Sequence, residues 1–231
     1  MMKLFFLIIV IFSTISQGFA KRPGVDMFCG KLIGGFGGTF ISPDDMNFRL
    51  EKSGMPLIPG EYLQVGGGYQ LIQSRIITEI EYFAILSRTE RHGNFTSSFS
   101  GQYSYFNIGF LLLGLKNFQI YPLAGLGYGK IELRVTEEGD FSFDTFLDNP
   151  INLRSFERDI FTGNIALGFD FLIRDNGKSS NTGLGFVFGV RAGFTYDISV
   201  GEWKANELQL GASPYMGLTG FYVRVVMGIW E

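Results

Sequence analysis

Hydrophobic and polar positions alternate most regularly between Phe161 and Ile198. In the first half of this stretch, every second residue is apolar or glycine: Phe161, Gly163, Ile165, Leu167, Phe169, Phe171 and Ile173. After a polar turn, the second half repeats the pattern with Leu184, Phe186, Phe188, Val190, Ala192, Phe194 and Tyr196. A β-strand directs successive side chains to opposite faces. The alternation therefore predicts two strands that each have one apolar face.

The composition of the two faces decides between a soluble and a membrane protein. In a soluble β-sandwich, the apolar face would pack on a protein core and the other face would meet water. Here the apolar face is long and rich in aromatic residues, whereas the opposite face combines glycine and small polar residues with a few charges such as Asp170 and Arg191. The second face has the composition expected of residues that line a narrow lumen. The pattern is typical of a membrane-spanning β-barrel.

The same alternation predicts eight strands along the chain. They cover residues 31–41, 62–72, 75–88, 101–113, 119–135, 161–174, 184–198 and 219–230. Most of them exceed the ~9–11 residues that a tilted strand needs to cross the hydrocarbon layer, so we expect them to project past it. The predicted fold class is all-β, a closed antiparallel up-and-down transmembrane β-barrel of eight strands.

The predicted connections alternate in length. Residues 73–74, 114–118 and 175–181 form short connections, whereas residues 42–61, 89–100, 136–155 and 199–218 form long ones. Outer-membrane barrels have short periplasmic turns and longer external loops. With an even number of strands, both ends of the barrel chain then lie on the periplasmic side. A soluble sandwich has no reason to sort its loops in this way.

The first 20 residues read as a secretory signal peptide. Lys3 supplies a positive charge, residues 4–12 are an unbroken apolar run, and Gly18-Phe19-Ala20 provides small residues for cleavage near Ala20. The apolar run is too short for a membrane-spanning helical anchor, which needs ~20 residues. We therefore divide the chain into a signal peptide (1–20), an N-terminal lead-in (21–30) and a barrel domain (31–231).

Composition excludes several other classes. The chain has 32 glycines and 25 phenylalanines among 231 residues, and 18% of its residues are charged. After the signal peptide, no apolar run approaches 18 residues, which excludes a helical membrane protein. The formal net charge is −3 and no basic run occurs, so nucleic acid is not an expected partner. Cys29 is the single cysteine, so no internal disulfide can form.

The signal peptide, the eight amphipathic strands and the closing stretch from Gly220 to Gly228 together resemble the small outer-membrane β-barrel families. The resemblance covers nearly the whole mature chain and implies a monomer in the bacterial outer membrane. Its implied partners are outer-membrane lipid and the barrel-assembly machinery. One departure is the C-terminus, where such chains commonly end in an aromatic residue, whereas here Trp230 is followed by Glu231.

Eight strands enclose an interior that side chains can fill. The candidate lumen residues are Arg75, Glu79, Glu81, Asn164, Asp170, Arg191, Asp197 and Arg224. Because an isolated buried charge costs several kcal/mol, these charges must be paired. We interpret them as an ion-pair network that plugs the barrel. The alternative is a narrow, gated polar path for small solutes.

No catalytic, cofactor or metal motif stands out. The single histidine, His92, falls in a predicted external loop and has no serine at a spacing that indicates a catalytic pair. The carboxylates Glu137, Glu138, Asp140, Asp144 and Asp148 could offer oxygen ligands to Ca²⁺. They lack the glycine-punctuated spacing of a calcium loop, so we interpret them as a solvated acidic loop.

The sequence therefore predicts a non-enzymatic outer-membrane barrel with a role in envelope integrity, surface interaction or porin-like passage of small solutes. One alternative is an envelope enzyme that transfers or removes acyl chains of lipid A. A weaker alternative is a soluble lipocalin-like carrier, in which the apolar faces would line the interior. We expect no bound cofactor.

Overall fold

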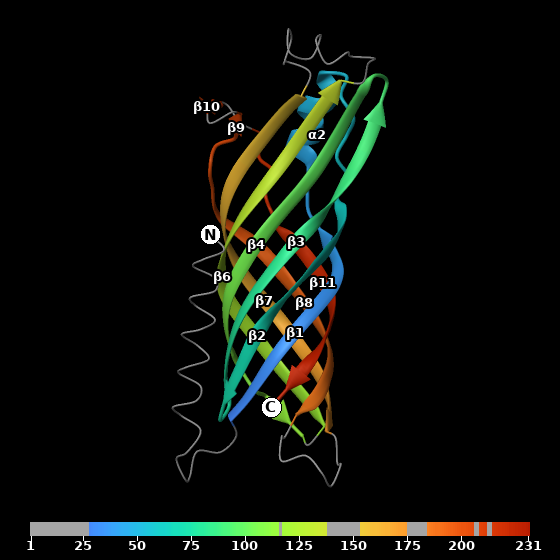
Figure 1. The fold of residues 1–231 in the computed structure, drawn as a ribbon. Helices are drawn as coiled ribbons and strands as arrows, with labels where there is room; N and C mark the ends of the chain where they lie inside the picture. Colours follow the sequence, from blue (N-terminus) through green and yellow to red (C-terminus); the bar gives the residue numbers. More distant parts are fainter. Residues whose placement is uncertain (1–27, 116, 138–152, 175–183, 206–207, 212–213) are drawn as a thin grey trace.

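A computed structural model describes residues 28–115, 117–137, 153–174, 184–205, 208–211 and 214–231, and it forms a single closed barrel (Figure 1). Its wall consists of the long strands β1 (Phe28–Phe40), β2 (Glu61–Gln73), β3 (Ile76–His92), β4 (Phe95–Phe110), β6 (Phe118–Glu137), β7 (Leu153–Arg174), β8 (Gly185–Val200) and β11 (Gly220–Trp230). Each long strand pairs antiparallel with the next one along the chain, and β11 pairs with β1. This topology confirms the predicted fold class.

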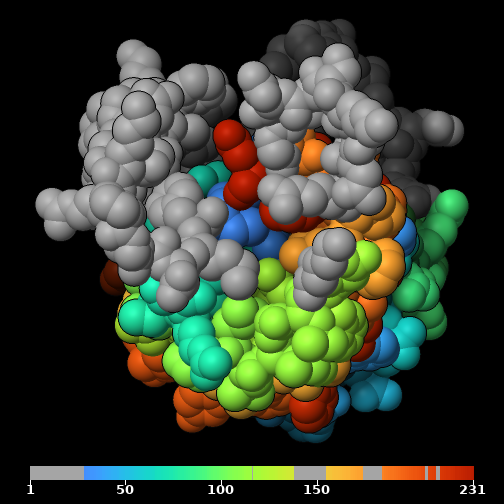
Figure 2. Space-filling view, turned by 90° about the horizontal axis from the view of Figure 1, so that it is seen from below, coloured from blue at the N-terminus to red at the C-terminus, as the bar shows by residue number. Residues whose placement is uncertain are grey.

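The barrel closes where its two ends meet. Gly30 and Glu231 exchange two backbone hydrogen bonds, with N···O distances of 3.1 and 3.0 Å. The view from below shows the start of β1 (blue) beside the C-terminal residues (red) at this end (Figure 2). β1 begins at Phe28, so the barrel starts before the predicted boundary at residue 31. The predicted signal peptide lies outside the described residues.

The apolar faces point away from the barrel axis, as predicted. Outward side chains such as Leu63 and Phe221 are 66% and 67% exposed. On β6 and β7, this apolar surface ends at Tyr128 and Phe161, beyond which the outward positions carry charges such as Lys130. A lipocalin-like carrier would need these faces inside, so the structure contradicts that alternative. We call the exposed apolar surface the apolar belt.

The predicted loop 89–100 is wrong. β3 continues to His92 and β4 begins at Phe95, so only Gly93 and Asn94 connect them, with Gly93 at φ +58°. Sequence reasoning missed this extension because the upper part of this hairpin carries polar residues on both faces. Its inward Phe99 is nevertheless buried. Long strands, rather than long loops alone, thus carry the chain past the apolar belt.

The predicted loop 42–61 contains the helix α2 (Asp44–Lys52), which sequence analysis did not predict. Asp44 and Asp45 stand in its first turn, where the helix dipole favours negative charge. The short strands β5 (Leu113–Gly114), β9 (Lys204–Ala205) and β10 (Leu208–Gln209) were also not predicted. Most of the predicted connections 136–155 and 175–181 lies outside the described residues.

The upper part of the barrel holds the largest apolar cluster of the described residues. α2 lies within the mouth formed by the tall strands (Figure 1), and its Met46 and Leu50 are buried. They belong to a cluster with Phe99 and Leu133, to which Trp203, Met216 and Leu218 also contribute. Among the described residues, no helix is long and apolar enough to cross a membrane.

Candidate functional site

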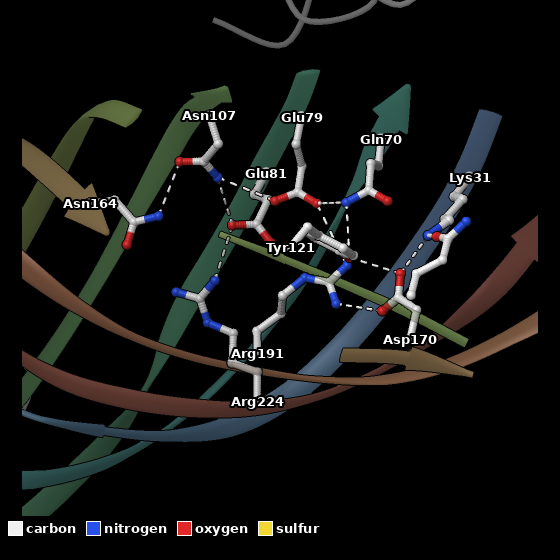
Figure 3. Close-up of polar contacts among 11 residues, drawn as sticks. Lys31, Gln70, Glu79, Glu81, Asn107, Tyr121, Asn164, Asp170, Arg191 and Arg224 are labelled. Carbon is white, nitrogen blue, oxygen red and sulfur yellow. Dashed lines mark hydrogen bonds and ion pairs between the residues drawn. The ribbon is translucent and has the colours of Figure 1, made fainter. Parts of the chain in front are cut away.

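A layer of buried polar side chains crosses the middle of the barrel, and every wall strand contributes to it (Figure 3). No member is more than 3% exposed. This polar layer consists of Lys31 (β1), Gln70 (β2), Glu79 and Glu81 (β3), Asn107 (β4), Gln119 (β6), Asn164 and Asp170 (β7), Arg191 (β8) and Arg224 (β11). Its members come from inward positions of the alternating strands.

Asp170 is the centre of the first half of the polar layer. One carboxylate oxygen lies 2.5 Å from Lys31 Nζ, and the other lies 2.6 Å from Arg191 Nη1. The Tyr121 hydroxyl donates to Asp170 at 2.7 Å, and Lys31 also donates to the Gln119 amide oxygen at 2.6 Å. One carboxylate therefore joins four strands, β1, β6, β7 and β8.

Arg224 and Glu81 form the second half, with 3.1 Å between Nη1 and Oε2. The Arg224 guanidinium also lies over the rings of Phe83 and Tyr222, at 3.9 and 3.8 Å from the ring centroids. Cation–π contacts of this kind strengthen when the cation is removed from water. Arg224 Nη2 also donates to the Tyr103 hydroxyl at 3.1 Å, so Arg224 is held by one charge, one hydroxyl and two aromatic faces.

Glu79 and Asn107 connect the two halves. The Asn107 amide donates to Glu79 and to Glu81, both at 3.3 Å, and Gln70 donates to Glu79 at 2.7 Å. Arg191 Nη2 approaches Glu79 at 3.7 Å. The six charged members are three cations and three anions, so the polar layer has no net formal charge when all are ionised. Such pairing is what buried charges require.

Apolar side chains fill the barrel on both sides of the polar layer. Toward the termini lies a cluster of Cys29, Ile72, Ile77, Leu111, Tyr121 and Leu123, all at most 5% exposed. Toward the opposite end, tyrosines of β4 and β11 lead into the upper apolar cluster. Tyr105 bonds to Thr195 at 2.9 Å and Tyr222 to Asn164 at 2.9 Å. Side chains thus occupy the interior above, within and below the polar layer.

The structure places six of the eight predicted lumen residues in the polar layer: Glu79, Glu81, Asn164, Asp170, Arg191 and Arg224. Arg75 does not belong there, and its assignment to the lumen is wrong. It is exposed in the turn before β3, where the preceding Ser74 has φ +59°. The predicted strand began one residue too early, so a turn residue was counted as an inward one.

Asp197 is buried but lies outside the polar layer. Its carboxylate accepts hydrogen bonds from the backbone N–H of Leu218 at 2.9 Å and of Thr219 at 3.1 Å. The Tyr215 hydroxyl donates to the same oxygen at 2.8 Å. Asp197 therefore fastens the segment before β11 to the upper end of β8, and does not pair with a charge of the polar layer.

Sequence reasoning missed Lys31, Gln70, Asn107 and Gln119, although the alternation held the signal for some of them. Lys31 precedes the outward Leu32, and Gln70 stands between the outward Tyr69 and Leu71, so both share the inward face. Lys31 and Gln119 stand at the first position of a predicted strand, where the alternation has only one neighbour to define the face. Gln70 and Asn107 are uncharged, and Asn164 was the one neutral amide among the predicted lumen residues.

His92 and Ser97, which are close in sequence, have different surroundings in the structure. His92 is exposed at the end of β3. Ser97 is buried, and its hydroxyl donates to the Pro56 carbonyl at 3.0 Å. No group of three or more His, Cys, Asp or Glu side chains within the described ranges could hold a metal ion. Of the acidic loop, Glu137 ends β6, and Glu138, Asp140, Asp144 and Asp148 lie outside the described residues.

Comparisons with known proteins add little to this geometry. No protein-family model matches the chain, and no curated protein matches it. Among solved structures, it is similar to a major outer membrane protein from Thermus thermophilus at 10% sequence identity, with 87% of this chain and 98% of that chain covered and a TM-score of 0.44. The assignment of the fold therefore rests on the strand pairing and the two faces of the wall. By these features, the chain has the architecture of a small outer-membrane β-barrel.

Proposed function

We propose that this protein is a monomeric, non-enzymatic outer-membrane barrel whose interior is closed. In this account, a signal peptide directs the chain out of the cytoplasm and the barrel-assembly machinery inserts it. The barrel then serves as a rigid membrane anchor for the structure above the apolar belt. The observation that carries the proposal is the combination of an apolar exterior with a charge-balanced, side-chain-filled interior.

The exterior supports a position in lipid. Large apolar side chains are exposed on every wall strand, and exposed patches on soluble monomers rarely exceed a few hundred Å². A closed barrel also satisfies its backbone hydrogen bonds within the wall, which is the condition for crossing a bilayer with strands. Lipid is therefore the environment in which this surface is stable.

The interior supports a closed barrel over a solute path. A conducting lumen would keep its charged residues in contact with water, whereas Lys31 and Asp170 are fully buried. Apolar clusters above and below them separate the polar layer from both ends. The role that remains for the barrel is structural, and contacts with other molecules fall to the upper end, where Phe48 of α2 is 70% exposed.

Planar-bilayer recordings test the closed interior. Purified protein inserted into a bilayer is expected to give no steady single-channel current at moderate voltage. Glu81→Ala combined with Arg224→Ala removes two large facing side chains of the polar layer and is expected to raise the frequency of current steps. Stable open channels of the wild-type protein would contradict a closed interior and favour porin-like passage.

Lipid A analysis tests the non-enzymatic assignment. Mass spectrometry of lipid A from a strain lacking the gene is expected to match that of the parent strain. Loss or gain of an acyl chain, restored by the wild-type gene, would instead support the lipid A-modifying alternative. A strain that carries the double variant Glu81→Ala and Arg224→Ala is the control, because it contains the barrel protein with an altered interior.

A further inference from the structure

The strands β2 and β3 part from each other at their upper ends. β2 stays paired with β1 up to Glu61, but its last pair with β3 is Gln64 with Ile85. Directly beyond Ile85, the pairing of β3 with β4 shifts register before Arg88. Such a bulge bends and twists its strand. The bend carries β3 away from the last residues of β2.

A groove of about 450 Å³ lies at this separation. Its apolar walls are Phe40, Leu63 and Leu86, which are 47%, 66% and 46% exposed and continue the apolar belt. Gly38 lies between them and contributes no side chain. A Cβ atom built on Gly38 would meet nothing closer than the Phe40 ring at 3.9 Å. The groove is therefore an apolar slot that opens toward lipid, with room above Gly38.

The same groove has a polar end. Tyr62 lines it from the inner side of the wall, where its ring packs on Phe99 with 5.0 Å between the ring centroids. Tyr62 is 4% exposed, yet its hydroxyl has no hydrogen-bond partner among the described residues. Arg88 and Glu61 line the groove as well, and Arg88 Nε donates to Glu90 at 2.8 Å. A guanidinium has five N–H donors, so this pair leaves Arg88 able to donate further. An unpartnered buried hydroxyl beside both charge signs indicates a polar ligand group.

We propose that this groove binds one phospholipid whose headgroup carries both a phosphate and a primary amine. An alkyl chain lies along Phe40, Leu63 and Leu86, the phosphate accepts hydrogen bonds from Tyr62 and Arg88, and the ammonium pairs with Glu61. The inference rests on the proposed function, because it needs the apolar belt to face lipid. Two carboxylates and one guanidinium line or adjoin the groove, which disfavours a headgroup with net negative charge.

Native mass spectrometry of the full-length mature protein in detergent, titrated with phosphatidylethanolamine, tests the site. The wild-type protein is expected to retain one lipid. Gly38→Leu fills the groove and is expected to weaken binding by more than about tenfold, since a bulky side chain displaces the alkyl chain. Gly34→Leu is the matched control, because Gly34 lies outward on the same strand, outside the groove, and its added Cβ would meet nothing closer than a backbone oxygen at 3.9 Å.

The identity of the headgroup is tested with a tyrosine variant and with a second lipid. Tyr62→Phe removes one hydrogen bond to a charged group and is expected to weaken binding about tenfold. Phosphatidylglycerol, which has a phosphate but no amine, is expected to bind more weakly than phosphatidylethanolamine. Equal binding of the two lipids, or unchanged binding by Tyr62→Phe, would overturn the assignment of the headgroup.

Failure of the groove proposal can be distinguished from failure of the proposed function. Each variant is first checked for a heat-sensitive shift in gel migration, which reports a folded barrel in detergent. Folded Gly38→Leu and Gly34→Leu proteins that bind lipid equally would overturn the groove and leave the proposed function intact. A wild-type protein that is soluble without detergent and shows no such shift would overturn both.

Discussion

Lys31 and Asp170 form a fully buried ion pair of 2.5 Å between residues 139 positions apart in the chain. Lys31 belongs to β1 and Asp170 to β7, and β8 and β11 separate these two strands in the wall. The pair therefore spans the interior and does not follow the wall. Arg191 reaches the same carboxylate from β8, so Asp170 neutralises two cations that have no access to water.

Asp170→Asn is expected to destabilise the barrel more than any exposed charge substitution. It leaves Lys31 and Arg191 buried with one carboxylate fewer, and breaking a buried pair typically costs about 3–5 kcal/mol. The urea midpoint of refolding in detergent micelles, followed by gel migration, measures the effect. Arg88→Gln is the control, because Arg88 is 54% exposed and exposed ion pairs contribute at most ~1 kcal/mol. Equal midpoints for the two variants would refute a central role for Asp170.

Gly217→Ala is expected to release the segment before β11 from β8. A Cβ atom on Gly217 would lie 1.8 Å from Asp197 Oδ2, so the carboxylate would have to leave the N–H groups of Leu218 and Thr219. Hydrogen exchange at residues 214–219 is expected to accelerate about tenfold or more, in line with the loss of charged hydrogen bonds. Gly211→Ala is the control, because its Cβ would meet nothing within 4 Å. Unchanged exchange in Gly217→Ala would refute the fastening role of Asp197.

Acid is expected to loosen β9 from β7 above the apolar belt. The Tyr128 hydroxyl and Lys204 of β9 donate to Asp159 and hold the pKa of this carboxyl below its usual value. Because the Asp159 pKa is lower in the folded than in the unfolded state, the ionised carboxylate stabilises the folded form at pH values above the unfolded-state pKa of ~3.9. This stabilisation is lost as the pH falls through the folded-state pKa. Exchange at residues 203–205, corrected for intrinsic rates, should therefore increase below about pH 4. Asp159→Asn should remove this pH dependence, and a wild-type profile in that variant would contradict the assignment.

The alternation predicted the wall best where one face meets lipid. Phe171 of β7 and Phe186 of β8, for example, lie on the exposed apolar face where the sequence placed them. It failed above the apolar belt, because both faces of the strand are polar around Thr89 and no apolar period marks the strand there. α2 was missed for a related reason: it buries only Met46 and Leu50, which is too short a pattern to stand out.

The polar layer was only partly predictable. Strand parity places Glu79 and Asp170 inward, but it carries no information about which residues meet across the interior. That depends on how the register of all eight strands combines around the closed wall. Asp197 shows the limit: its inward parity is the same as that of Arg191, yet its position near the end of β8 brings it to backbone N–H groups and not to cations.

Gel migration of the protein extracted from outer membranes tests the central claim most directly, because a lipid-embedded closed barrel resists detergent until it is heated. The protein is expected to fractionate with outer membranes, to need detergent for extraction, and to migrate differently before and after boiling. Identical migration of the two samples, together with recovery of the protein in the soluble fraction, would contradict the account.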